Sequence, residues 1–312
     1  MNLPKGQLTS SEWIAHFLAT DPPRSKSLVM TIFGDAIAPH GGAIWLGSLI
    51  ELLAPFGVND RLLRTSVFRL AQEGWLVANR DGRRSSYAIL PQALPRFERA
   101  NRRIYAPLTA HWDGSWTMLL GATSAVDAPT RASLRKELAW AGFAQIAQGV
   151  FGHPAAGADV IDDILARLGV QGKLLVCRAS ELPGVATRAL RELAAQGWDL
   201  SDVVQGYRGF IGQFQPLLAA LEAGEVLAPE GAFVIRSLLI HAYRRVQLHD
   251  PMLPIELLPD PWPGSEAYAL ARALYRLTQA QAEVHIMEAL LREDGAAPAA
   301  HASFLLRFGG LV

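Results

Sequence analysis

The apolar residues near the N-terminus change their spacing along the chain, and this spacing predicts three helices in succession. The stretch SLVMTIFGDAIA (27–38) is apolar almost all round, which is typical of a buried helix. The stretch AIWLGSLIELLAPFG (43–57) repeats its apolar residues at steps of three and four, which predicts an amphipathic helix. Asn59 is a favourable N-cap for a third helix that reaches about Glu73, and Gly74 follows where glycine often ends a helix.

Two short stretches after the third helix have the composition of β-strands. WLVANR (75–80) and RSSYAIL (84–90) lie on either side of Asp81-Gly82, a dipeptide that strongly indicates a hairpin turn. Three helices followed by a hairpin is the element order of a winged helix-turn-helix. We therefore predict a DNA-binding domain of this type over residues 24–104.

Strand-like and helix-like patterns alternate in the middle of the chain, after a boundary at Ala106 and Pro107. The expected elements are a strand at 115–122, a helix at 128–142, a strand at 143–154, a helix at 157–169 and a strand at 172–179. This alternation predicts a split βαβ, ferredoxin-like domain over residues 105–182.

From about Pro183 onward the pattern is mainly helical. Long amphipathic stretches cover residues 186–196, 200–223, 230–248 and 265–291. The intervening segment LHDPMLPIELLPDPWPG (248–264) contains five prolines and is expected to be extended. We expect a helical C-terminal domain over residues 183–312 that senses a ligand and dimerises, and an overall fold of the α+β class.

The net charge is zero, but the charges are unevenly distributed. Between Arg24 and Arg103 there are twelve Lys/Arg and six Asp/Glu, a net charge of +6 that leaves −6 for the rest of the chain. A basic module on an acidic body favours one face that binds a polyanion. The single cysteine, Cys177, and the lack of a long apolar run indicate a cytoplasmic protein with no membrane partner.

The third predicted helix has an apolar side and a basic side. The apolar side holds Leu62, Leu63, Val67, Leu70 and Ala71. Phe68 falls on the basic side, and we expect it to pack against the second helix. Guanidinium groups can contact phosphates or the guanine edge, and short hydroxyls can add hydrogen bonds. The predicted DNA-binding residues are Arg61, Arg64, Thr65, Ser66 and Arg69 on the helix and Arg80, Arg83, Arg84 and Ser85 at the hairpin.

A solvated charged helix face is the alternative interpretation of these arginines. Such faces usually alternate in sign, so that oppositely charged residues pair at a spacing of four. Here the only acidic residues of the segment are Asp60 and Glu73, at the two ends of the helix. The distribution therefore favours DNA binding.

Several motifs resemble the PaaX-type regulators, the repressors of phenylacetate degradation. SLVMTIFGD, RTSVFRLAQEGWL and GRRSSYAIL are similar to their winged-helix domain, and GSWTMLLGA with FAQIAQGVFGHP is similar to their middle domain. The most specific likeness is LLIHAYRRVQLHDPMLPIELLPDPWPG, near the C-terminus. The resemblance extends from Ser27 to about Leu291. It implies a dimeric repressor whose middle domain has a Cas2-like fold. It also implies that phenylacetyl-coenzyme A releases this repressor from double-stranded operator DNA.

A basic row in the predicted helix 230–248 is a candidate site for the phosphates of such an acyl-coenzyme A effector. We expect the row to be exposed, and ion pairs with nearby acidic residues are the alternative. Together with the resemblance, the row predicts a ligand site formed by Arg236, His241, Arg244 and Arg245. No other cofactor is expected.

Other kinds of chemistry have weaker support in the sequence. His241, His249 and Asp250 are the best candidates for a metal site, but two histidines eight residues apart on one continuous helix could not share an ion. The motifs GxxxxGK[ST], GxGxxG after a strand, GxSxG and CxxC are absent. We therefore predict neither catalytic residues nor a metal. A Cas2-like nucleic-acid-cleaving enzyme and a purely structural DNA-binding protein remain as alternatives.

Overall fold

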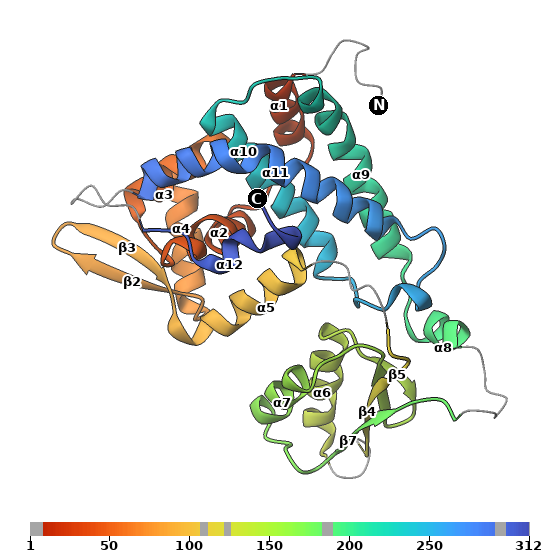
Figure 1. Ribbon diagram of the computed structural model, residues 1–312. Helices are drawn as coiled ribbons and strands as arrows, with labels where there is room; N and C mark the ends of the chain where they lie inside the picture. The colour runs from red at the N-terminus through yellow and green to blue at the C-terminus, as the bar shows by residue number, and fades with distance from the viewer. Residues whose placement is uncertain (1–8, 107–111, 122–125, 183–189, 291–297, 312) are drawn as a thin grey trace. The chain divides into compact units, whose positions relative to one another are not determined.

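The computed structural model describes residues 9–106, 112–121, 126–182, 190–290 and 298–311 (Figure 1), and these form two compact units. Unit 1 comprises the described residues of 1–107, 207–247 and 265–312. Unit 2 comprises the described residues of 108–206 and 248–264. Of the expected elements, Ala122, residues 186–189 and Leu291 lie outside the described residues.

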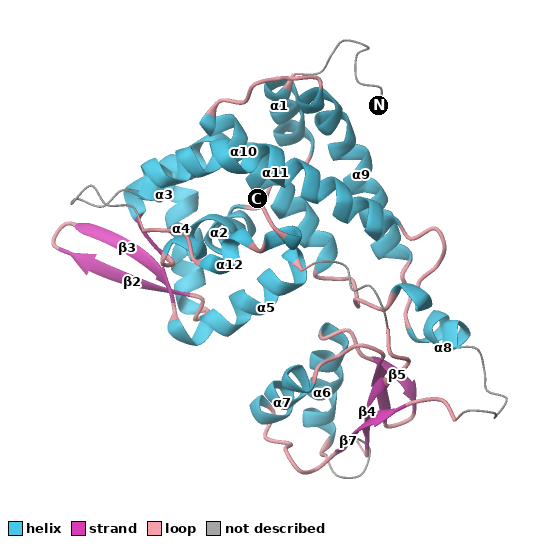
Figure 2. Cartoon of the chain, in the orientation of Figure 1, coloured by secondary structure: helices cyan, strands magenta, loops and turns pink. Residues whose placement is uncertain are grey.

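Unit 1 contains a winged helix with a three-stranded antiparallel sheet in the order β1-β3-β2. The elements are α2 (Ser25–Ile32), the π-helix η1 (Phe33–Ile37), β1 (Ala43–Trp45), α3 (Leu46–Leu53), α4 (Asp60–Gln72), β2 (Leu76–Asp81) and β3 (Arg84–Ile89). The β2–β3 hairpin projects away from the helices as the wing (Figure 2). The predicted winged helix-turn-helix is therefore confirmed as a fold.

Local sequence explains the position of α4 and the hairpin. The Asn59 side chain accepts a hydrogen bond from the Leu62 backbone N–H at 2.9 Å and so caps the helix. Gly74 follows the helix with a φ of +73°, a conformation that favours glycine. In the hairpin Asp81 pairs with Arg84, so that Gly82, with a φ of +56°, and Arg83 form the turn.

Two local predictions differ from the structure, and one helix was not predicted. The predicted helix 43–57 begins instead with strand β1, because residues 43–45 pair with β3. The predicted helix 27–38 is α2 continued by the π-helix η1. Helix α1 (Ser10–Thr20) was not predicted, although Thr9 and Glu12 form a capping box that marks its start.

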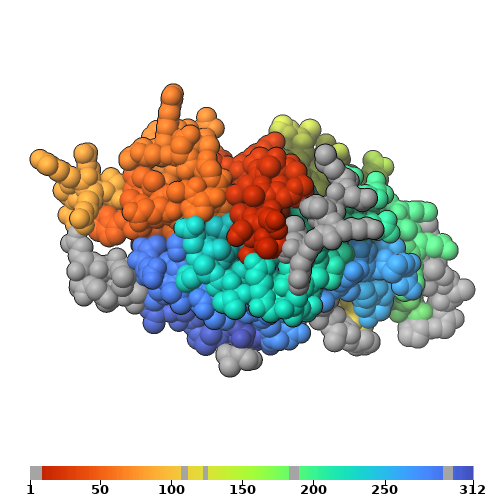
Figure 3. Space-filling view, turned by 90° about the horizontal axis from the view of Figure 1, so that it is seen from above, coloured from red at the N-terminus to blue at the C-terminus, as the bar shows by residue number. Residues whose placement is uncertain are grey.

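Further helices of unit 1, one soon after the hairpin and the others nearer the C-terminus, complete the core of the winged helix. They are α5 (Leu94–Tyr105), α9 (Ser201–Glu222) from Tyr207 onward, α10 (Pro229–Gln247), α11 (Pro263–Leu290) from Ser265 onward and α12 (Ala302–Leu305). Phe33, Phe233 and Tyr275 are among the large side chains that are fully buried. Helix α1, in red in Figure 3, lies against the teal α9–α10 region, where Trp13 packs on Phe214. The three consecutive domains expected from the sequence therefore do not match the compact units.

Unit 2 is a four-stranded antiparallel sheet with two helices on one face. Its elements are β4 (Trp116–Leu120), α6 (Ala128–Trp140), β5 (Ala144–Ala147), β6 (Val150–His153), α7 (Ala158–Arg167), β7 (Leu175–Ala179) and α8 (Leu190–Gly197). The strand order β5-β6-β4-β7 is that of a split βαβ, so the ferredoxin-like prediction is confirmed. The predicted strand 143–154 is a hairpin, because Gly149, with a φ of +74°, turns the chain between β5 and β6.

The two faces of this sheet are covered by different segments. Leu119 and Phe151 pack with Leu134 and Leu138 of α6 and with Ile164 of α7. On the other face Trp116 packs with Ala194 of α8 and Leu257. The proline-rich segment 248–264 therefore packs on unit 2. Leu257 packs with Trp116, and the carbonyl of Pro251 lies 2.8 Å from Nε2 of His153.

Candidate nucleic-acid interface and buried ion network

Helix α4 presents a basic face to solvent. Leu63, Val67 and Leu70 are fully buried and fix the inner side of the helix. The predicted DNA-binding residues Arg61, Arg64, Thr65 and Arg69 are exposed. Arg64 makes a surface ion pair, because its Nε lies 2.7 Å from Oδ1 of Asp60. The face can therefore offer several guanidinium groups to a polyanion.

Three side chains of α4 point differently from the prediction. Ser66 is only 4% exposed, and its hydroxyl donates to the Leu62 carbonyl at 2.9 Å and lies 2.9 Å from the hydroxyl of Ser25. It is therefore unavailable to DNA. Leu62 and Phe68, which were expected to pack inward, are 46% and 58% exposed.

The wing carries the other predicted basic residues. Arg80, Arg83 and Arg84 are exposed around the tip of the β2–β3 hairpin, and Ser85 is half-buried. The hairpin and α4 belong to the same winged helix. A duplex bound by α4 would therefore contact the basic groups of the wing as well.

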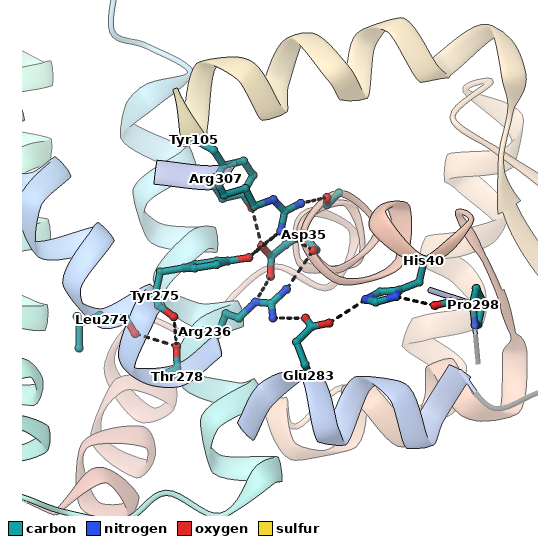
Figure 4. A network of polar contacts seen from close by, with 11 residues as sticks. Asp35, His40, Tyr105, Arg236, Leu274, Tyr275, Thr278, Glu283, Pro298 and Arg307 are labelled. Atoms are coloured by element: carbon teal, nitrogen blue, oxygen red, sulfur yellow. Dashed lines mark hydrogen bonds and ion pairs between the residues drawn. The ribbon is translucent and has the colours of Figure 1, made fainter. Parts of the chain in front are cut away.

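Asp35, on the π-helix η1, is the centre of a buried polar network in unit 1 (Figure 4). Its Oδ1 accepts hydrogen bonds from the hydroxyls of Tyr105 at 2.6 Å and Tyr275 at 3.0 Å and from Nη1 of Arg307 at 3.0 Å. Its Oδ2 accepts from Nε of Arg236 at 2.8 Å. Burial raises the pKa of both tyrosines, so both hydroxyls remain protonated donors.

Arg236 is fully buried, in contrast to the exposed basic row that we expected. Burial opposes its charge, but the negative charge of Asp35 raises its pKa above the usual value. Its Nη1 donates to Glu283, which in turn accepts from Nε2 of His40 at 2.9 Å. The guanidinium carbon of Arg236 lies 4.9 Å from the centre of the Tyr275 ring. Arg236 therefore joins the C-terminal helices to the winged helix and has no free donor face for a ligand.

The other predicted ligand residues lie further along α10. His241 is buried, and its Nδ1 lies 3.1 Å from the hydroxyl oxygen of Thr31. That hydroxyl donates to the Ser27 carbonyl at 3.1 Å, so its oxygen accepts and His241 Nδ1 is the donor. Burial, then the charges of Arg244 and Arg245, lower the pKa of His241 to about 4. The ring is therefore neutral at neutral pH.

Arg244 and Arg245 differ in their partners. Arg245 is exposed and makes an ion pair with Asp21 at 2.8 Å. Arg244 is half-buried, and burial lowers its pKa. Its Nη1 lies 3.4 Å from the hydroxyl oxygen of Thr31, and within the described ranges it has no carboxylate at ion-pair distance. Among the three predicted ligand arginines, Arg244 is thus the one whose positive charge is not balanced by a carboxylate within the described residues.

The described residues contain no group of three or more His, Cys, Asp or Glu side chains placed to hold a metal. No helix in the described part of the chain is long and apolar enough to cross a membrane. Sequence reasoning missed the role of Asp35, Glu283 and Arg307, because nothing in their local sequence relates one to another.

Comparisons with known proteins cover nearly the whole chain. Residues 24–92 match the family model described as PaaX-like protein, residues 109–191 match the PaaX protein central Cas2-like domain, and residues 198–288 match the PaaX-like protein C-terminal domain. The solved structure of the uncharacterized protein Rv0674 from Mycobacterium tuberculosis matches with a TM-score of 0.50 and 27% identity, covering 82% of this chain and 98% of that one. The Transcriptional repressor PaaX of Escherichia coli (strain K12) is 38% identical over 301 residues, which are 96% of this chain and 94% of the relative. The chain therefore belongs to the PaaX family, as its motifs indicated.

Proposed function

We propose that this protein is a transcriptional repressor that binds operator DNA and controls genes of phenylacetate breakdown. The observation that carries the proposal is the exposed arginine face of α4 within a winged helix. It is supported by 38% identity to a transcriptional repressor over nearly the whole chain.

In the proposed complex α4 enters the major groove and the wing lies along the backbone. Arg61 and Arg69 contact phosphates or base edges, and Arg64 exchanges its surface partner Asp60 for the DNA. That exchange costs little, because an exposed ion pair is worth only about 0.2–1 kcal/mol. The wing arginines add sequence-independent affinity, which decreases as the salt concentration rises.

The proposed repressor acts as a homodimer on two half-sites. Two copies related by a two-fold axis would read a pseudo-palindrome whose half-sites are about one helical turn, or a multiple of it, apart. Sedimentation of the free protein and footprinting of the complex measure these two properties separately.

The proposed effector is an aryl-acyl-coenzyme A, with phenylacetyl-coenzyme A as the first choice. The phosphates of coenzyme A require cations, and in unit 1 Arg244 lacks a carboxylate partner among the described residues. Among the described residues, its exposed neighbour Arg245 forms an ion pair with the half-buried Asp21. Arg236 and His241 are buried, so in this proposal they support the site from within and do not contact the ligand.

Helix α2 is the route by which the effector would act on α4. Thr31 of α2 contacts His241 and Arg244 of α10, and Ser25 of the same helix contacts Ser66 of α4. A ligand that displaces Arg244 therefore changes a contact of α2, and α2 packs directly on the proposed recognition helix. The ligand must favour one arrangement by about 1.4 kcal/mol for each tenfold change in DNA affinity.

A nuclease activity of the ferredoxin-like unit is not part of the proposal. Asp113, the acidic residue just ahead of β4, accepts hydrogen bonds from Ser115 and makes an ion pair with Arg178 at 2.8 Å. The family comparison also favours a repressor.

Fluorescence anisotropy with DNA from the gene's own upstream region tests the proposal. We expect salt-dependent, competitor-resistant binding by the wild type, weaker binding by Arg69→Ala, and unchanged binding by Arg135→Ala, an exposed arginine on α6 of unit 2. Phenylacetyl-coenzyme A should release the DNA, whereas coenzyme A and phenylacetate, added separately, should not. Equal affinity of all three proteins would contradict the proposed interface.

A further inference from the structure

Phe68 is an exposed aromatic side chain in the middle of a basic surface. Its exposed fraction is 58%, whereas an aromatic side chain on a helix ordinarily packs inward. Arg61, Thr65, Phe68 and Gln72 are separated by four, three and four residues, so they form one stripe along α4. All four are exposed, so this stripe is the outermost line of the helix. Phe68 is therefore at the centre of the surface that would face DNA.

The charges around Phe68 limit what can cover it. Arg61, Arg64 and Arg69 lie on the same exposed side of α4 as Phe68, and in the described part of the chain Arg61 and Arg69 have no ion-pair partner. A second copy of this chain docked through the same face would bring two sets of arginines together, which is unfavourable. A polyanion that also offers an apolar group satisfies both the arginines and the ring.

We infer that Phe68 contacts the 5-methyl group of thymine in the major groove and so determines a preference for A·T at one position of each half-site. The thymine methyl is the apolar group that the major groove displays, and phenylalanine is among the side chains that contact it. The position of the ring on the outer line of a helix favours this groove, because the wedges that kink DNA enter the minor groove. This inference rests on the proposed DNA-binding function.

The experiment first selects bound sequences from a random duplex library with the wild type and with Phe68→Ala. Each thymine of the selected site is then replaced, one at a time, by deoxyuridine, which lacks only the methyl group. Removing one buried methyl should weaken wild-type binding about three- to fivefold at the contacted thymine. Phe68→Ala should still bind DNA through its arginines, but the penalty at that thymine should disappear and the base preference there should relax.

Two further variants sharpen the test. Phe68→Leu retains an apolar contact and should keep part of the deoxyuridine penalty. Trp140→Ala removes an aromatic side chain that is 69% exposed on α6 of unit 2, and it should keep the full penalty.

The possible failures are distinguishable. If the wild type selects no sequence and binds no DNA at low salt, the proposed function itself is wrong. If the wild type selects a site but Phe68→Ala keeps the same deoxyuridine penalty, the inference alone is overturned. If Phe68→Ala instead lowers the oligomeric state in sedimentation, the ring contacts a second copy of the chain, and the inference is again overturned.

Discussion

The substitution Asp35→Asn keeps the size of a buried side chain but removes the carboxylate that Arg236 and Arg307 share. The two carboxylate oxygens accept four hydrogen bonds, from two arginines and from the hydroxyls of Tyr105 and Tyr275. An asparagine amide offers one oxygen and one donor nitrogen, so at least one of the four donors would face another donor.

The magnitude follows from burial on both sides of the ion pair. Arg236 is 0% exposed and Asp35 is 2% exposed. Water therefore cannot solvate the charge of Arg236 once the carboxylate is removed. Removing one partner of a buried ion pair costs about 3–5 kcal/mol. For a unit of this size, each kcal/mol shifts the melting temperature by about 2–4 °C, so a decrease on the order of 10 °C is expected.

Urea unfolding followed by circular dichroism at the helix band measures the effect. Asp21→Asn is a matched control, because it makes the same chemical change in an exposed ion pair with Arg245 and should cost at most about 1 kcal/mol. If both variants unfold at the same urea concentration, the buried carboxylate of Asp35 does not stabilise unit 1.

The remaining predictions concern DNA, pH and the effector. Arg69→Ala should weaken operator binding by about 1–3 kcal/mol without changing the unfolding midpoint, and a loss of stability with intact DNA binding would show that the side chain packs inward. Between pH 7 and 5 the unfolded chain protonates His241, with an ordinary pKa of about 6.5, while the folded ring, with a pKa of about 4, stays neutral. Stability should therefore fall by about 2 kcal/mol more in the wild type than in His241→Gln on acidification, as measured by urea unfolding at both pH values. Calorimetry of the Arg244→Ala, Arg245→Ala double variant should show at least tenfold weaker binding of phenylacetyl-coenzyme A, and affinity equal to the wild type would exclude these arginines from the site.

The sequence predicts the winged helix well because its signals are local. The Asn59 cap, the Asp81-Gly82 turn and the apolar period of α4 all lie within a few residues of the element that they define. The orientation of α4 is less predictable, since it depends on the neighbouring helix. Ser25 on α2 approaches Ser66 at 2.9 Å, so the small serine faces inward and the larger Leu62 is turned toward solvent.

The candidate ligand site shows a second limit of sequence reasoning. Arg236, Arg244 and Arg245 have similar positions in one amphipathic stretch, but their environments in the structure range from fully buried to exposed. The difference comes from distant partners, because Asp35 is 201 residues from Arg236 and Asp21 is 224 residues from Arg245. A single sequence contains no signal that pairs residues so far apart.

The long separation between Asp35 and its arginines also affects how the protein matures on the ribosome. Arg307 is 272 residues further along the chain than Asp35. A nascent chain that has exposed only its winged helix holds the Asp35 carboxylate without Arg236 and Arg307, and unit 1 is completed only after Arg307 has been synthesised. A chain shortened by a premature stop codon should therefore be degraded, and it should not persist as a DNA-binding fragment that ignores the effector.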